Sequence, residues 1–478
     1  MNSAGIRRIL KNSAYLYMTL LMSQGLRFIY IFVIARLLGA EMYGLLAFGN
    51  AWYMMFLPMT GLGLGIYLSQ KVGKNAQKAE FRTVPLVASI RFIAVTLVAS
   101  VCLFVGLVNA DTQAISIIIA IYTVALIGRA MLLWSTQMFQ AYEQTIYVFK
   151  LERIFKPAEV TLGLLVAFAT ENVLLVASVH ALGMICQGGI AVFWVNKYLV
   201  KVNLTWRPRI MLALVVKLLP LGIAVALGQF LFQGPVVLLK QEGVTLSQIG
   251  NFSLAIQLFV VLLSIFSSIR AAALPALSRN AKSSFSKLQS YSHYSIVIGV
   301  VFGCSCALLA SQLAEPIIVW LFTEKFRLAG NVMAILVWAL IPAIIHNMLN
   351  SSQAALEHNK SILLINVLGA STLIVGMFYW LDAQFVEGAA YTVIAGFGTA
   401  ALASALYLVK KKVLRALPSV IWPALITLLT FTLNDILNDH VVTFAALFIS
   451  ISVMLILSWW LLMDAQVRKL ILERVVKR

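Results

Sequence analysis

Residues 84–107 read VPLVASIRFIAVTLVASVCLFVGL, a stretch of 24 residues in which Arg91 is the only charged side chain. A helix of about 20 mostly apolar residues is needed to cross the hydrocarbon core of a bilayer, which is roughly 30 Å thick. The stretch therefore predicts a membrane-spanning helix that carries an arginine inside the bilayer.

Segments of this kind recur along the whole chain of 478 residues, of which 62% are hydrophobic and only 11% are charged. Soluble domains carry about a quarter charged residues, so the mean hydropathy of +0.95 indicates that lipid is the solvent for most of the chain. We count fourteen candidate spans, at residues 14–39, 43–69, 84–107, 114–139, 155–170, 172–196, 217–240, 247–271, 293–323, 328–352, 361–381, 386–409, 418–437 and 441–463. The sequence predicts an all-α integral membrane protein with about fourteen transmembrane helices.

The basic residues predict how these helices are oriented. If the N-terminus is inside, the inner connections hold 29 of the 36 Lys and Arg residues, and the outer connections hold Arg36, Lys240, Lys325 and Arg327. Short cytoplasmic loops are enriched in Lys and Arg. The pattern predicts a multi-pass membrane protein with both termini in the cytoplasm. We expect residues 464–478 to form an amphipathic helix on anionic membrane lipids.

The same distribution excludes several classes of function. The net charge of +19 is spread over short segments rather than gathered in one patch, which argues against a nucleic-acid partner. The longest hydrophilic connection, at about residues 197–216, is too short to hold a soluble domain. There is no P-loop, HExxH or GxSxG motif, and the four cysteines lie in apolar runs. We expect no enzyme activity, no cofactor and no metal site.

A weak internal repeat appears when the chain is shifted by 206 residues. Tyr43-Gly44 then falls on Ile249-Gly250, and each pair follows an outer turn that contains an acid. Six helices per repeat is an even number, so both units insert in the same orientation, related by a pseudo-two-fold axis along the membrane normal. The predicted parts are an N-lobe of helices 1–6 (residues 1–200), a C-lobe of helices 7–12 (201–412), and helices 13–14 with the tail (413–478). The substrate path is expected between the two lobes.

Ionisable side chains inside the hydrocarbon cost at least ~2.5 kcal/mol each and are functional candidates by default. No acid is expected at mid-membrane, because Glu159 and Glu315 are assigned to positions close to helix ends. Arginines without carboxylate partners favour a bound anion, and guanidinium suits phosphate because it forms bidentate hydrogen bonds. The alternative is structural, since membrane arginines also snorkel or cap helices; lone His180 is expected to be a packing or hydrogen-bonded residue. The candidate substrate-binding residues are Arg27, Arg91, Arg129, Arg270, Arg36 and Gln24.

Three stretches carry a family resemblance. Residues 35–45, ARLLGAEMYGL, resemble the signature that ends helix 1 in polysaccharide-repeat (Wzx-type, O-antigen) flippases of the multidrug/oligosaccharidyl-lipid/polysaccharide exporter superfamily. Residues 219–222, LPLG, and 274–279, LPALSR, are similar to that family's pattern, whereas residues 321–326, LFTEKF, lack its usual glycine before the acid.

The resemblance implies a flippase that moves an undecaprenyl-pyrophosphate-linked oligosaccharide across the bacterial inner membrane by alternating access. It implies that Arg27, Arg91 and Arg129 contact the anionic headgroup in a cationic central cavity. Further partners are then a polysaccharide polymerase and chain-length proteins. No metal or cofactor is implied.

Two other functions compete with this one. A cation-coupled multidrug exporter of the MATE type usually needs a buried carboxylate, and it becomes attractive if Glu159 lies deeper in its helix than assigned. A membrane enzyme acting on lipid-linked sugars usually has a sizeable outer loop, and the outer connections here are only a few residues long.

Overall fold

The computed structural model describes residues 3–283, 285–356, 358–380, 385–414 and 452–453, and within these ranges the chain is helical and has no β-strand. Nearly all of the predicted helices 13 and 14 and the predicted surface helix at 464–478 lie outside the described residues. The prediction of an all-α membrane protein is confirmed, and the count of fourteen helices stays a prediction.

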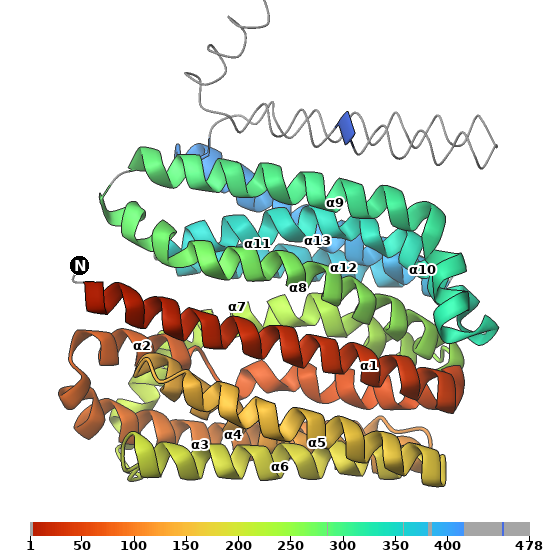
Figure 1. Ribbon diagram of the computed structural model, residues 1–478, viewed down its shortest axis with the longest axis horizontal. Coiled ribbons are helices and arrows are strands. Elements are labelled where there is room, and N and C mark those ends of the chain that lie inside the picture. The colour runs from red at the N-terminus through yellow and green to blue at the C-terminus, as the bar shows by residue number, and fades with distance from the viewer. Residues whose placement is uncertain (1–2, 284, 357, 381–384, 415–451, 454–478) are drawn as a thin grey trace, which may run out of the picture. The chain divides into compact units, whose positions relative to one another are not determined.

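Figure 1 shows the helices in chain order, and the first twelve predicted spans each coincide with helical segments. The helices are α1 (Ser3–Phe56), η1 (Leu57–Thr60), α2 (Leu64–Lys74), α3 (Ala76–Val108), α4 (Gln113–Ala141), α5 (Ile146–Thr170), α6 (Val173–Tyr198), α7 (Pro208–Gln241), α8 (Leu246–Ser283), α9 (Phe285–Phe322), η2 (Glu324–Phe326), α10 (Arg327–Leu336), η3 (Val337–Ala339), α11 (Leu340–Ala355), α12 (Asn359–Trp380) and α13 (Phe385–Lys410). Ten stretches of the described residues are long and apolar enough to cross a membrane. The protein is therefore a multi-pass membrane protein.

The long helix α1 contains two of the predicted spans, joined by a sharp turn at Gly39. Gly39 has φ 75° and ψ 176°, which interrupts the helix. Glycine adopts this backbone conformation readily because it has no β-carbon. The turn lies within the stretch 35–45, so the signature residues mark the junction between the first two predicted spans.

The second predicted span, 43–69, is not the continuous helix that the sequence indicates. It changes to the 3-10 turn η1 at Leu57, and Leu62 (φ 45°) and Gly63 (φ 73°) then adopt left-handed conformations before α2 begins. Pro58 supplies part of the physical reason, because proline has no N–H to continue a helix. Hydropathy missed the break because every residue around it is apolar or small.

The described helices form two compact units, and most contacts between helices lie within one unit or the other. The first is Met1–Leu254 with Ile318–Ala329 and Met377–Ala389, and the second is Ala255–Ile317 with Gly330–Gly376 and Ala390–Arg478. The lobe boundaries at residues 200 and 412 stay a prediction.

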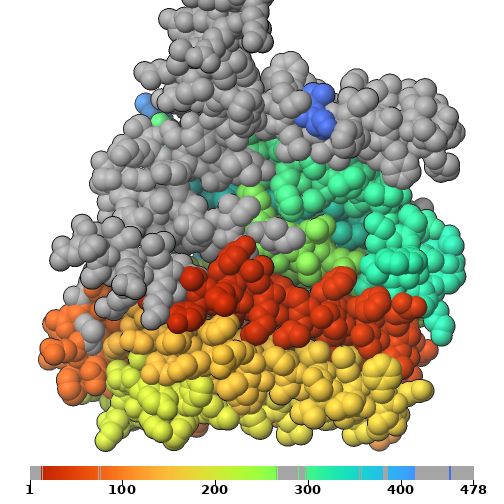
Figure 2. All heavy atoms as spheres, in the orientation of Figure 1, coloured from red at the N-terminus to blue at the C-terminus, as the bar shows by residue number. Residues whose placement is uncertain are grey.

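In the first unit, α5 lies between α1 and α6, as the colours in Figures 1 and 2 show. Close approaches bring these helices together. A β-carbon at Gly163 of α5 would lie 2.8 Å from the ring of Tyr30 on α1, and one at Gly188 of α6 would lie 2.3 Å from the carbonyl oxygen of Gly128 on α4. Small residues allow membrane helices to approach closely, so α1, α4, α5 and α6 form one tightly packed group.

The repeated glycines contact each other at a helix crossing. A β-carbon at Gly44 would lie 1.9 Å from the carbonyl oxygen of Leu246, and one at Gly250 would lie 2.0 Å from that of Ala40. The 206-residue shift relates the two contacts to each other, since it takes Gly44 to Gly250 and Ala40 to Leu246. The contact is therefore reciprocal, as a two-fold relation between the repeats requires.

An ion pair joins two turns of the first unit. Lys240 at the end of α7 donates a hydrogen bond of 2.5 Å to Asp111 in the turn between α3 and α4. This hydrogen bond lowers the pKa of the Asp111 carboxyl group. The pair accounts for two of the charges that the sequence assigns to the outer side.

The second unit has an apolar core of its own. Phe259 of α8 contacts Phe397 of α13 with ring centroids 6.3 Å apart, and a β-carbon at Gly299 of α9 would lie 2.3 Å from Ile344 of α11. His346 is buried in this core, where its Nδ1 lies 3.4 Å from the hydroxyl of Ser404.

Candidate functional site

Two of the predicted arginines, Arg27 and Arg129, interact electrostatically inside the first unit. Arg27 lies about 18 Å along α1 from the Gly39 turn, at a rise of about 1.5 Å per residue, and Arg129 lies in α4 beside the close crossing of Gly128 with α6. Both side chains are partly buried, and they are near enough for their charges to repel. The Nε of Arg129 is buried and has no hydrogen-bond partner within the described ranges. The pair forms a cationic centre at membrane depth.

A buried carboxylate lies beside this pair, and this corrects the sequence-based expectation. Glu159 is near the middle of α5, its side chain is only 9% exposed, and it interacts electrostatically with Arg27. Its Oε1 lies 2.7 Å from Nδ1 of His180, and its Oε2 accepts a hydrogen bond of 3.0 Å from Lys156. The expectation was wrong because the helix begins at Ile146 rather than at residue 155, which moves Glu159 away from the helix end.

Aromatic side chains enclose the His180 side of the cluster. The Tyr53 hydroxyl lies 3.4 Å from Nε2 of His180, so both ring nitrogens of the histidine have polar neighbours. Tyr53 stacks on Tyr122 with ring centroids 5.4 Å apart, and Tyr122 contacts His180 at 5.6 Å. The expectation that His180 is hydrogen-bonded is consistent with these contacts. The carboxylate–histidine pair was missed by sequence reasoning, since the two residues are 21 positions apart on different helices.

The contacts that hold Arg91 differ from those of this cluster. It is buried, and it donates hydrogen bonds of 3.3 Å to the side-chain oxygen of Gln137 and to the carbonyl oxygen of Ala130. A β-carbon at Gly61, in the break after η1, would lie 3.3 Å from its guanidinium. These contacts favour a structural role for Arg91 in tying α3 to α4 beside the helix break. Its role as a headgroup contact stays a prediction.

The remaining predicted residues are distributed over other surfaces. Arg36 is exposed, and its guanidinium lies 5.5 Å from the ring centroid of Phe32. Gln24 is partly buried on α1, three residues before Arg27. Arg270 lies in α8, and its side chain is outside what the structure describes. No contact brings Arg36 or Gln24 to the cluster among the described residues.

The cluster of Arg27, Arg129, Glu159 and His180 is charged but does not have the grouping of side chains that a metal site needs. Within the described ranges, no three His, Cys, Asp or Glu side chains are grouped as a metal site, and the four cysteines are free. Two guanidinium groups next to a carboxylate–imidazole pair are suited to bind an anionic group and to hold or exchange a proton.

Comparison with known proteins places this geometry in a family and a fold. The family model described as "Polysaccharide biosynthesis protein" matches residues 9–281, which is more than half of the chain. No curated protein matches the sequence closely enough to count as a relative.

Several solved structures share the fold at low sequence identity. The lipid II flippase MurJ in an inward closed conformation superimposes with a TM-score of 0.71 and 12% identity, over 94% of this chain and 98% of MurJ. An inward-facing MATE family multidrug resistance transporter of the MOP superfamily gives 0.66 and 13% identity, over 82% and 94% of the two chains. The Vibrio cholerae MATE transporter VcmN in its bent form gives 0.55 and 16% identity, over 87% and 99%.

These matches confirm the predicted resemblance at the level of the family and the fold. The match to the family model covers the signature at residues 35–45, the Gly39 turn and the helices that carry Arg27, Arg129 and Glu159. The chain belongs to the polysaccharide biosynthesis protein family and has the fold of the MOP-superfamily transporters.

Proposed function

We propose that this protein is a flippase that moves an undecaprenyl-pyrophosphate-linked oligosaccharide from the cytoplasmic to the periplasmic leaflet of the bacterial inner membrane. The observation that carries this proposal is the pair of arginines, Arg27 and Arg129, which lie within electrostatic range of each other on two membrane helices, α1 and α4. Two guanidinium groups match the charge of a pyrophosphate, and the planar fork of each can donate two hydrogen bonds to phosphate oxygens. No bond of the substrate is made or broken, so the protein needs no catalytic residue.

The fold supports alternating access as the mechanism. MATE transporters of the same fold are known in inward-facing and in outward-facing conformations. In the proposed cycle, the headgroup binds at the arginine pair from the cytoplasmic side and leaves on the periplasmic side, while the lipid tail stays in the bilayer. A polymerase and chain-length proteins would then use the delivered repeat unit.

The neighbouring carboxylate has a defined part in this proposal. Glu159 offsets part of the positive charge of the arginines when no substrate is bound, which lowers the cost of holding two cations in the bilayer. Its hydrogen bonds to His180 and Lys156 keep the carboxylate on one side of the cluster. A bound pyrophosphate then interacts with cations whose positions are already set, which favours binding.

The test is deletion of the gene followed by complementation and mass spectrometry of the lipid-linked intermediate. We expect the deletion strain to accumulate an intact repeat unit at the inner leaflet. Arg27→Ala and Arg129→Ala should fail to restore surface polysaccharide at normal protein level, whereas Arg153→Ala should restore it. Arg153 is a suitable control because it is an exposed arginine near the beginning of α5, away from the pair. A truncated repeat unit in the deletion strain would indicate an enzyme instead, and normal polysaccharide from a chain that lacks both arginines would exclude the proposed headgroup site.

A cation-coupled multidrug exporter is the second candidate, and Glu159 is the observation that favours it. A buried carboxylate at the middle of a membrane helix is suited to bind a proton or Na⁺. The two arginines beside it oppose this role, because they repel an incoming cation. The exporter is supported if the deletion raises drug susceptibility and leaves the lipid-linked intermediates unchanged.

A further inference from the structure

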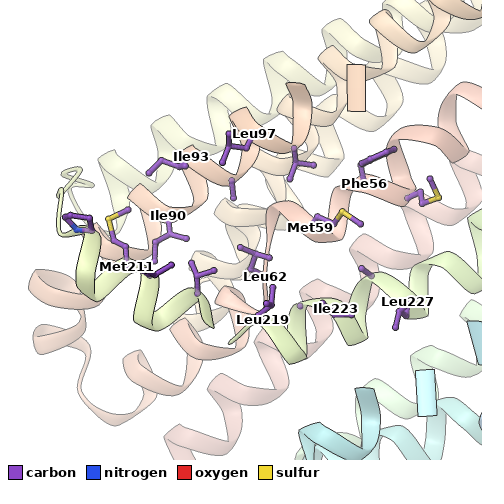
Figure 3. A pocket seen from close by; sticks show the side chains of 18 of the residues that line it. Phe56, Met59, Leu62, Ile90, Ile93, Leu97, Met211, Leu219, Ile223 and Leu227 are labelled. Atoms are coloured by element: carbon purple, nitrogen blue, oxygen red, sulfur yellow. The ribbon is translucent and has the colours of Figure 1, made fainter. Parts of the chain in front are cut away.

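A long apolar groove lies on the first unit between α3, α7 and the break after α1. Its volume is about 780 Å³, and its walls are almost entirely carbon and sulfur. Figure 3 shows Ile90, Ile93 and Leu97 of α3 on one side and Leu219, Ile223 and Leu227 of α7 on the other. Phe56, Met59 and Leu62 from the broken segment complete the wall.

The groove is as long as the hydrocarbon core is thick. Its lining along α7 begins at Pro208 and ends at Phe230, which is about 33 Å at a rise of 1.5 Å per residue. The hydrocarbon core measures about 30 Å, so the acyl chain of a phospholipid in one leaflet reaches only about halfway. A groove of this length therefore fits a single apolar chain that is longer than one leaflet.

A basic hollow adjoins the Met211 end of the groove. It has a volume of about 950 Å³, and the cations that line it are Lys71, Lys78, Arg82 and Arg207. The lining residues in the described part of the chain include no Asp or Glu. Lys71 lies in the last turns of α2, Lys78 and Arg82 lie near the beginning of α3, and Arg207 precedes α7, so separate segments contribute to one cationic surface.

The groove and the hollow adjoin each other at two places, the segment 206–211 and the packing of Leu86 against the cluster of Met211. Trp206 and Met211 line the groove, and Arg207 and Ile210 between them line the hollow. Leu86 lines the hollow and packs in the same buried cluster as Met211, which lines the groove. An anion in the hollow and an apolar chain in the groove are therefore placed as parts of one molecule.

We propose that this groove and hollow together form a docking site for a polyprenyl phosphate, with the phosphate in the basic hollow and the isoprenoid chain along α3 and α7. The site is separate from the Arg27–Arg129 pair, because neither arginine lines the groove or the hollow. The inference rests on the proposed function in one respect, because the carrier lipid of that substrate class is a long polyprenyl phosphate. It adds a second contact that holds the carrier lipid on the cytoplasmic side.

The test measures binding of radiolabelled undecaprenyl monophosphate to the full-length protein in phosphatidylcholine nanodiscs. Leu219→Trp and Ile223→Trp place bulk in the groove, and we expect each to weaken binding about tenfold, as the loss of about two buried methylene contacts does. Val225→Trp is the matched control, because Val225 is exposed on the same helix and does not line the groove. A thermal unfolding temperature equal to that of the parent protein shows that each variant is folded.

The phosphate end is tested separately with a short chain. Removing two charges with Lys78→Gln and Arg82→Gln together should weaken binding of both undecaprenyl and farnesyl monophosphate. Lys150→Gln and Arg153→Gln remove the same charge from exposed positions at the beginning of α5 and should have no effect. The groove variants should leave farnesyl monophosphate binding unchanged, because that chain is too short to fill the groove.

Three results overturn the docking site: undecaprenyl monophosphate binding that is unchanged in both groove variants, equal weakening by Val225→Trp, or displacement of the probe by phosphatidylglycerol at equal concentration. The last result would assign the groove to a bilayer phospholipid. Binding as expected in a protein that translocates no lipid-linked oligosaccharide in vesicles would overturn the proposed function and leave the docking site intact.

Discussion

Glu159 is the residue whose position most changes the chemistry of the membrane-depth cluster. Its carboxylate accepts from Lys156 and contacts His180, and it lies within electrostatic range of Arg27. A buried ion pair is costly to break, because removal of one partner leaves the other charge without compensation. The carboxylate therefore holds the cationic side chains in place whether or not it also binds a cation.

We expect Glu159→Gln to lower the thermal unfolding temperature and to reduce surface polysaccharide without changing drug susceptibility. A hydrogen bond to a charged group contributes about 2 kcal/mol, so the loss of stability should be measurable by fluorescence-detected unfolding. The control is Glu171→Gln, the same substitution at the exposed C-terminal end of α5. Increased drug susceptibility with normal polysaccharide would instead establish the carboxylate as the coupling residue of an exporter.

At the scale of elements, the crossing of α1 with α8 depends on two glycines that the repeat relates. The helices approach so closely that a β-carbon on either glycine would overlap a carbonyl oxygen of the other helix. At this distance between the helices, only glycine fits at positions 44 and 250. The crossing also explains why the signature YG at residues 43–44 ends in glycine.

We predict that Gly250→Ala destabilises the protein by about 1–3 kcal/mol, the usual cost of overpacking a tight contact. Gly189→Ala in α6 is the control, since a β-carbon there meets nothing within 4 Å. Both variants are compared by thermal unfolding in detergent. Gly44→Ala should give a similar loss, and the double variant should lose less than the sum, because both substitutions separate the same pair of helices. Fully additive losses would show that the two glycines do not share one contact.

At the scale of the whole molecule, the distribution of Lys and Arg predicts an even number of membrane crossings. The connections assigned to the inner side hold 29 of the 36 Lys and Arg residues, and those assigned to the outer side hold four; this kind of asymmetry sets the orientation of short-looped membrane proteins. The turns between α7 and α8 and between α3 and α4, which carry Glu242 and Asp111, are predicted to lie on the outer side.

We expect green fluorescent protein fused after Arg478 to fluoresce and alkaline phosphatase at the same position to be inactive. The opposite pattern is expected for fusions in the turn between Gln241 and Leu246, because that turn is assigned to the outer side. Green fluorescent protein matures in the cytoplasm and the phosphatase in the periplasm, so each fusion reports one side. An active phosphatase at the C-terminus would mean that only one of the segments 418–437 and 441–463 crosses the membrane.

The sequence alone was sufficient for the helical membrane fold, for the helical segments on which the first twelve predicted spans fall, and for the family. These features follow from properties that act along the chain: hydrocarbon thickness sets the segment length, loop charge sets the orientation, and the stretch 35–45 carries its turn glycine locally. It also identified Arg27, Arg91 and Arg129 as charges inside apolar segments, since such a charge is visible without any tertiary contact, and their role in substrate binding stays a prediction.

Only the tertiary structure decided which of these charges meet. The helices are apolar on nearly all sides, so periodicity does not give the rotation of one helix against the next. Packing through Gly163 and Gly128 brings Glu159 and Arg129 to the same cluster, while Arg91 faces Gln137. The groove along α3 and α7 depends on the broken segment after Phe56, where left-handed residues interrupt an apolar stretch that looks continuous. These features depend on contacts between distant segments, and the physical reason that the sequence does not reveal them is that such contacts leave no local pattern.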